Sequence, residues 1–426
     1  MNVICAPPEP KIAMPSGGDL SAVLYGYADR PGVASIGAAV LSTIKRANIA
    51  PGPRAWDLLT IALSVIVADT GVRRKESPDG WTRQINLQIA VNDPAFWSAQ
   101  AALLSRQLQF LTTDIWELEF LAGGLLPAPP KRPVLPTQDC VSLLSGGLDS
   151  FVGAIDLSGT AGKSPYLVSQ VSQGDKKKQV YFASKIGGGL SQLQLNHNVE
   201  CPDENERSQR ARSIVFLAYG VLLATALKRY KDGNPVTLYV CENGYISINP
   251  PLTGTRLGSL STKTTHPVFL GLFQQLLDAA GLNVRVENPY QFKTKGEMLA
   301  GCSDQDFLKR HASSTTSCGR FARNGYRHCG RCLPCLIRRS SFHAWGGADT
   351  TDYVFDDLSK DDENHARFDD VRSAAMAVAQ VKADGLERWL GASLNSVLMG
   401  DIAPYKDVVR RGIDELGVFL KAAGVS

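Results

Sequence analysis

The chain has 426 residues, more than one ordinary domain holds, which predicts two or three domains. Its composition, 44% hydrophobic and 20% charged, excludes extensive disorder and is sufficient for a sizeable core. With 45 basic and 41 acidic residues the net charge is only +4, so overall charge gives no reason to expect nucleic acid as a partner.

The first residues carry no basic segment followed by an apolar run, which argues against a secretory signal. The most apolar stretch, residues 58–68, is far shorter than the roughly 20 residues that a membrane span needs. We therefore expect a cytoplasmic protein without a membrane partner, whose nine cysteines are thiols or metal ligands.

Residues 1–127 are predicted to form an N-terminal accessory domain. Ile85, Leu87, Ile89 and Val91 alternate with less apolar residues, which predicts one amphipathic strand. The region is expected to be α/β or α+β, and we assign it as α+β. It contains no catalytic pattern.

A linker is predicted at residues 128–137, because four prolines between Ala128 and Pro136 cannot join a helix or a central strand. After it, apolar segments with strand character alternate with helical ones over residues 138–345, which predicts βαβ units and a parallel sheet covered on both faces. The predicted strands are 140–144, 166–171, 236–241 and 284–287, and the predicted helices include 207–230 and 267–280. Residues 346–426 are expected to be a small helical extension, with helices near 371–390 and 405–423.

A glycine-rich turn follows the first of these strands: Ser145-Gly146-Gly147-Leu148-Asp149-Ser150, and then an apolar helical stretch. A strand, a glycine turn and a helix in this order direct backbone N–H groups and the positive helix end at a phosphate. The two serines can donate hydrogen bonds, and Asp149 can hold Mg²⁺ or orient the loop. The alternative is a turn that merely connects strand and helix.

Four cysteines form the second signal: Cys318, Cys329, Cys332 and Cys335. Four local thiolates at this spacing suit a tetrahedral structural Zn²⁺, and an iron–sulfur cluster is the alternative that spacing leaves open.

The glycine turn resembles the PP-loop of ATP pyrophosphatases, and its combination with the cysteine pattern resembles the QueC (7-cyano-7-deazaguanine synthase) family over residues 140–339. This resemblance implies a Rossmann-like adenine nucleotide alpha-hydrolase core that binds ATP and Mg²⁺ and adenylates a carboxylate. It also implies adenine contacts at Arg212 and Ser213. Lys295, in a Lys-Thr-Lys stretch similar to one in that family, is expected to neutralise the substrate carboxylate or charge developing on phosphate. Lys176 to Lys178 either meet phosphate or start a solvated helix.

The sequence departs from QueC after the third predicted strand, where Glu242-Asn243-Gly244 replaces a Tyr-Pro-Asp-Cys-Arg segment. The additional N- and C-terminal regions resemble QatC, the QueC-like component of the Qat antiphage system, or its relative in type IV CBASS operons. This implies an enzyme that transfers a 7-carboxy-7-deazaguanine-type carboxylate to ammonia or to a protein amine, with QatA-like and QatB-like partners.

Two alternatives remain open. Six arginines between residues 320 and 339 make the cysteine region basic, which keeps a tRNA-modifying or otherwise nucleic-acid-binding enzyme under consideration. The other alternative is a non-catalytic nucleotide-binding scaffold in a defence complex.

Overall fold

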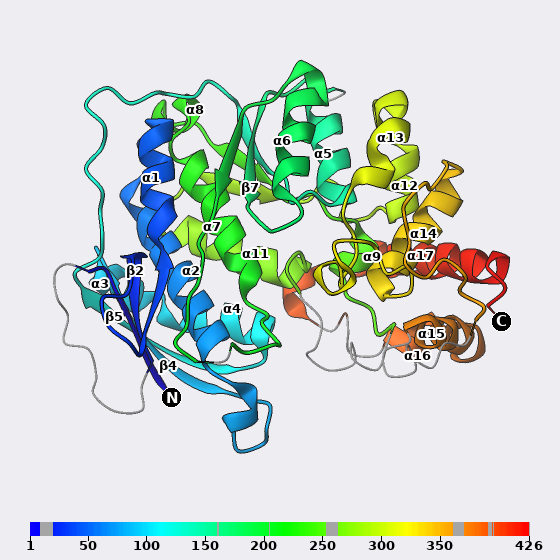
Figure 1. The fold of residues 1–426 in the computed structure, drawn as a ribbon, viewed down its shortest axis with the longest axis horizontal. Helices are drawn as coiled ribbons and strands as arrows, with labels where there is room; N and C mark the ends of the chain where they lie inside the picture. Colours follow the sequence, from blue (N-terminus) through cyan, green and yellow to red (C-terminus); the bar gives the residue numbers. More distant parts are fainter. Residues whose placement is uncertain are drawn as a thin grey trace.

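The computed structural model describes residues 1–8, 20–159, 162–203, 205–252, 263–360, 370–390, 394 and 396–425. Two five-stranded sheets, each covered by helices, lie beside one another, and a group of helices follows at the C-terminal end (Figure 1). The predicted α/β class with a helical C-terminal region is confirmed.

The first sheet has the strand order β3-β2-β1-β4-β5, and all neighbouring strands are parallel. Its strands are β1 (Asn2–Ala6), β2 (Leu20–Gly26), β3 (Val33–Gly37), β4 (Gln84–Val91) and β5 (Ile115–Ala122). The helices that accompany it are α1 (Ala38–Ala47), α2 (Pro53–Gly71), α3 (Pro94–Ala99) and α4 (Ala101–Thr112). Parallel strands need crossover connections, so the α+β assignment of this region is corrected to α/β. The predicted strand near residue 85 is β4.

The second sheet has the order β10-β9-β6-β7-β8 and is also parallel throughout. Its strands are β6 (Cys140–Leu143), β7 (Pro165–Gln170), β8 (Gln192–Leu195), β9 (Val236–Tyr239) and β10 (Val284–Glu287). Its helices include α5 (Leu148–Ser158), α6 (Lys176–Lys185), α7 (Arg212–Ala224), α8 (Lys228–Lys231), α9 (Gly244–Ser247) and α11 (Pro267–Ala279). Residues 123–139, where the linker is predicted, contain no helix or strand.

The predicted helix over residues 207–230 is wrong in its extent. It begins at Arg212, because the backbone N–H groups of Arg210 and Ala211 donate to the Asp69 carboxylate at 2.7 and 2.8 Å. Asp69, on α2, accepts both N–H groups, and residues 207–211 stay outside the helix.

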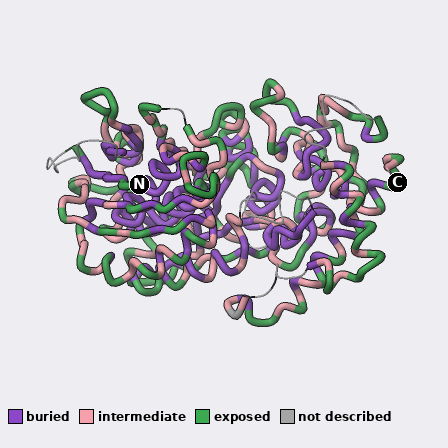
Figure 2. The backbone as a smooth tube through the Cα atoms, turned by 90° about the horizontal axis from the view of Figure 1, so that it is seen from below, coloured by how far each residue is buried: buried purple, intermediate pink, exposed green. Residues whose placement is uncertain are grey.

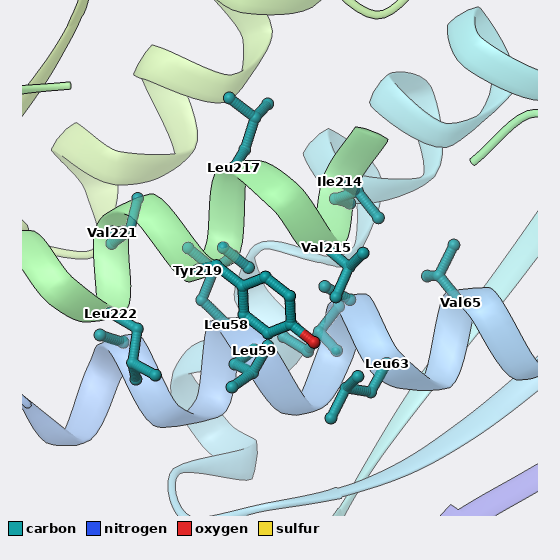
Figure 3. Close-up of a cluster of buried hydrophobic side chains, with 14 of the residues drawn as sticks. Leu58, Leu59, Leu63, Val65, Ile214, Val215, Leu217, Tyr219, Val221 and Leu222 are labelled. Carbon is teal, nitrogen blue, oxygen red and sulfur yellow. The ribbon is translucent and has the colours of Figure 1, made fainter. Parts of the chain in front are cut away.

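The two sheets share one apolar core. Helix α2 lies between the first sheet and α7, and 16 of its 19 residues are buried. Figure 3 shows the contact: Leu59 and Leu63 of α2 face Tyr219 and Leu222 of α7. Buried residues accordingly continue from one sheet to the other in Figure 2.

The C-terminal helices are α12 (Lys295–Ala300), α13 (Gln305–His311), α14 (Leu333–Trp345), α15 (Asp370–Asp384), α16 (Leu386–Leu390) and α17 (Ala403–Ala422). Helix α17 packs against α14 and against α9, the short helix that follows β9 of the second sheet. Within the described ranges, no helix combines the length and apolar character that crossing a membrane requires.

Candidate functional site

The glycine turn connects β6 to α5 at the point where the second sheet's strand order reverses, which is where open parallel sheets bind ligands. The hydroxyls of Ser145 and Ser150 lie 3.0 Å apart, and Ser150 also donates to the Gly147 carbonyl at 3.1 Å. Gly146 has φ of 94°, a conformation that favours glycine. These contacts close the turn into a preformed loop at the start of α5, as the phosphate-loop prediction requires.

A cleft of about 270 Å³ opens above this loop. Its lining includes Lys295 of α12 and the segment just before the first clustered cysteine. The lining residues are Ser145, Gly147, Leu148, Asp149, Ser150, Cys241, Glu242, Ile246, Lys295, Thr316, Ser317, Pro334 and Ile337. The structure thus brings the loop and Lys295 into one site.

Asp149 is the centre of a buried polar cluster in this cleft. Its carboxylate lies 2.5 Å from the Lys295 ammonium. Asn243 donates to the same carboxylate from its backbone N–H at 3.0 Å and from its side-chain amide at 2.7 Å. The Asn243 amide also donates to Glu242 at 3.1 Å.

The two carboxyl groups of this cluster differ in protonation. Burial alone would raise the pKa of Asp149, but the charge of the Lys295 ammonium and the hydrogen bonds from Glu242, Lys295 and Asn243 together outweigh it and hold this pKa well below its usual range. Burial raises the pKa of Glu242 well above its usual range, and the adjacent Asp149 charge raises it further. The cleft therefore favours the ionised form of Asp149 and the protonated form of Glu242.

Lys295 is held in place by the start of α12. Thr294 and Glu297 form a capping box, in which each side chain accepts from the other residue's backbone N–H. Arg411 of α17 donates to Glu297 at 2.6 Å, and Thr294 also hydrogen-bonds Glu415 of the same helix. The C-terminal helix thereby supports the residue that pairs with Asp149.

The four clustered cysteines are buried, and their Sγ atoms all lie within 4.8 Å of one another. The Cys318–Cys332 and Cys329–Cys335 sulfurs are 3.8 and 3.9 Å apart. A tetrahedron with zinc–sulfur bonds of about 2.3 Å has edges of about 3.8 Å, so this set fits one Zn²⁺. A four-iron cluster would need its thiolates farther apart, which disfavours that alternative.

The cysteine loop forms one wall of the cleft. Thr316, two residues before Cys318, donates its backbone N–H to the Gly146 carbonyl at 2.9 Å. Its hydroxyl contacts Asp175, and Lys178 donates to it at 2.9 Å. Lys178 therefore lies beside the phosphate loop, and burial lowers its pKa, whereas Lys176 and Lys177 are exposed at the start of α6.

Comparison with known proteins agrees with this geometry. A family model described as "Queuosine biosynthesis protein QueC" matches residues 264–346. The chain is 34% identical over 242 residues to the 7-cyano-7-deazaguanine synthase of Rhizobium rhizogenes, covering 50% of this chain and 91% of that protein. The chain belongs to the QueC family. The 7-cyano-7-deazaguanine synthase of Rhizobium etli CIAT 652 is 28% identical over 249 residues, 52% of this chain and 94% of its own length. No solved structure matches.

Two residues that the QueC resemblance implies do not join the cleft. Arg212 and Ser213 begin α7, and neither is among the described residues that line it. Burial lowers the pKa of His197 to about 4, and the charge of the nearby Arg212 lowers it further. Adenine contact at these residues remains a prediction.

Sequence reasoning overlooked Glu242, Asn243 and Thr316 as site residues. The first two were visible only as a departure from the QueC pattern. In the structure Asn243 donates hydrogen bonds to Asp149 and to Glu242. Thr316 had no signal except its position two residues before Cys318.

Most arginines near the cysteines have internal partners. Arg338 donates to Thr315 and to the Ala312 carbonyl, at 2.9 and 2.8 Å. Arg331 donates to carbonyls of residues 357–360. Arg327 and Arg339 pair with Asp352 and Asp356. These contacts argue against an open basic surface for nucleic acid.

Proposed function

We propose that this QueC-family enzyme uses ATP to adenylate a 7-carboxy-7-deazaguanine-type carboxylate and transfers the acyl group to an amine. The observation that carries the proposal is the Asp149–Lys295 ion pair, inside a cleft formed jointly by the phosphate loop and the cysteine loop. The names of the Rhizobium relatives support the deazaguanine assignment.

The reaction has two steps. A carboxylate oxygen attacks the α-phosphorus of ATP, the bond to the bridging oxygen breaks, and pyrophosphate leaves with an acyl-adenylate formed. An amine nitrogen then attacks the acyl carbon, loses a proton, and AMP leaves. The backbone N–H groups of the loop and the positive end of the α5 dipole bind the phosphates. Lys295 offsets the charge of the carboxylate or the phosphate.

Glu242 suits this chemistry because its surroundings favour the protonated form. A second ionised carboxylate beside Asp149 would repel both the phosphates and the substrate carboxylate. A protonated Glu242 avoids that repulsion and can donate a hydrogen bond to an anionic oxygen in the cleft.

Two metal ions fit the residues present. Asp149 offers the ionised oxygen ligand that Mg²⁺ prefers, and this ion would neutralise the pyrophosphate when bound. The four cysteines would hold Zn²⁺ as a structural ion, since a complete set of four protein ligands leaves no open position.

We include the acceptor in the proposal: a protein amine supplied by a partner in antiphage defence, such as a QatA-like or QatB-like protein. Two features support it, namely the altered segment at Glu242 and Asn243 and the additional regions, since nearly half of this chain lies outside the alignment with the Rhizobium etli relative. Mass spectrometry of the candidate partners after the reaction tests for the added base.

The primary test is pyrophosphate release from ATP and Mg²⁺ with 7-carboxy-7-deazaguanine. We expect release that needs the base and is lost in Asp149→Ala, while Asp278→Ala, an exposed carboxylate on α11, behaves as the wild type. Release without the base, or release that persists in Asp149→Ala, contradicts the proposal. Nucleotide binding without turnover would instead favour the scaffold.

A further inference from the structure

The first sheet carries a large cavity outside the proposed active site. Its volume is about 710 Å³, within the range of small-molecule pockets. Residues of α1, the turn from Ile49 to Pro53, Trp56 of α2 and the coil Leu126–Pro130 line it. This coil runs past α1 in Figure 1, and we call the space the proline-walled cavity.

The coil is fixed at both sides of the cavity. Gly124 donates its N–H to the Val91 carbonyl at 3.1 Å. Farther along, Val134 donates to the Asn48 carbonyl at 2.7 Å, and the Asn48 side chain donates to Arg132 at 2.9 Å. The wall is therefore attached to the sheet and to α1.

The position of the cavity matches that of a ligand site. The first sheet, ordered β3-β2-β1-β4-β5, has the same topology as the second, ordered β8-β7-β6-β9-β10 when read from its other edge. Sheets of this order bind ligands beyond the carboxyl ends of their strands. Trp56 lies near Tyr25 at the end of β2, with ring centroids 6.0 Å apart, and the lining coil follows the end of β5.

The lining indicates the chemistry of the ligand. Lys45 and Lys231 are the charged residues among the 16 that line the cavity, and the lining contains no carboxylate. The other walls are mainly aliphatic side chains and five prolines, with the buried Trp56, only 2% exposed, at the inner wall. Because prolines have no N–H, these walls offer few donors to an extended peptide, whereas flat rings pack well on them.

We propose that the proline-walled cavity binds a small aromatic anion, with its rings against the prolines and aliphatic side chains and its acidic group near Lys45 and Lys231. Nucleoside monophosphates and aromatic carboxylates share this chemistry. The site is separate from the cleft at Asp149, so it does not rest on the proposed adenylation.

The full chain, labelled with 5-fluorotryptophan, is titrated with 8-anilinonaphthalene-1-sulfonate and with its uncharged analogue N-phenyl-1-naphthylamine. Trp56→Phe assigns the Trp56 fluorine signal among the six tryptophans. We expect saturable binding of the sulfonate that shifts this signal. The Lys45→Glu/Lys231→Glu variant should weaken sulfonate binding at least about tenfold and change binding of the uncharged analogue less than about twofold.

Arg46→Glu is the matched control, since Arg46 is an exposed neighbour of Lys45 that does not line the cavity. It should bind the sulfonate as the wild type does. Equal affinity in the double variant, an equal loss in Arg46→Glu, or binding that leaves the Trp56 signal unmoved overturns the proposal.

Competition identifies the source of the ligand. Displacement of the sulfonate by AMP identifies a nucleotide, and displacement by 7-carboxy-7-deazaguanine identifies the free base acid. Displacement by neither at millimolar concentration overturns the proposal. Asp149→Ala should leave the Trp56 response intact while pyrophosphate release is lost, so the two proposals fail independently.

Discussion

Glu415 is a carboxyl group whose titration should affect stability near neutral pH. It lies on α17, where it hydrogen-bonds Thr294 beside Lys295. Burial raises its pKa from 4.5 to about 7, with the charge of Glu297 adding to the effect. Below pH 4.5 both the folded and the unfolded chain carry the proton. Between pH 4.5 and 7 only the unfolded chain loses it, so stability falls as pH rises and then levels off.

Glu415→Gln should remove this dependence, because glutamine stays neutral and retains an acceptor for Thr294. A pKa rise from 4.5 to about 7 corresponds to at most about 3 kcal/mol of unfolding free energy. We expect the variant to exceed the wild type by up to that amount at pH 8 and to match it near pH 4.5. Urea unfolding followed by tryptophan fluorescence measures the difference.

Asp414→Asn, which removes an exposed carboxylate next in sequence, is the control and should show little pH dependence. A stability difference between Glu415→Gln and the wild type that is constant from pH 4.5 to 8 would refute the reasoning, since it would show that the folded protein does not hold the proton more tightly.

Three further outcomes are expected. Cys332→Ser should lower bound zinc, measured by inductively coupled plasma mass spectrometry, well below one ion per chain and reduce the thermal midpoint; full zinc content would contradict the four-cysteine site. Lys295→Met should lower the rate of pyrophosphate release roughly 10²- to 10³-fold, whereas the exposed Lys293→Met should retain it. Leu59→Ala should cost about 2–5 kcal/mol in urea unfolding, and Met376→Ala, which is exposed, should cost little; equal losses would argue against the shared core.

The sequence predicted those parts of the site that are local in the chain. The phosphate loop and the cysteine cluster each occupy fewer than 20 residues, and their spacing alone carries the geometry. The strands β6, β7, β9 and β10 were predicted as well, because they are short apolar runs between turns and helices.

Other features depend on contacts between distant residues. The cluster of Asp149, Asn243 and Lys295 joins residues that are 94 and 146 positions from the aspartate, which no local pattern reveals. β2 was missed because it is buried on both faces and lacks the alternation of a half-buried strand. The start of α7 was misplaced because Asp69, far away in sequence, takes its N–H donors.

The packing of α2 against α7 has a consequence for synthesis of the chain. Helix α2 is complete at Gly71, but the helix that covers it ends about 150 residues later, at Ala224. At roughly 5–20 residues per second, a ribosome takes on the order of 10–30 s to supply that cover. The first sheet thus emerges with an apolar helix exposed, and a translational pause before residue 212 would prolong the interval in which nascent chains can aggregate or recruit chaperones.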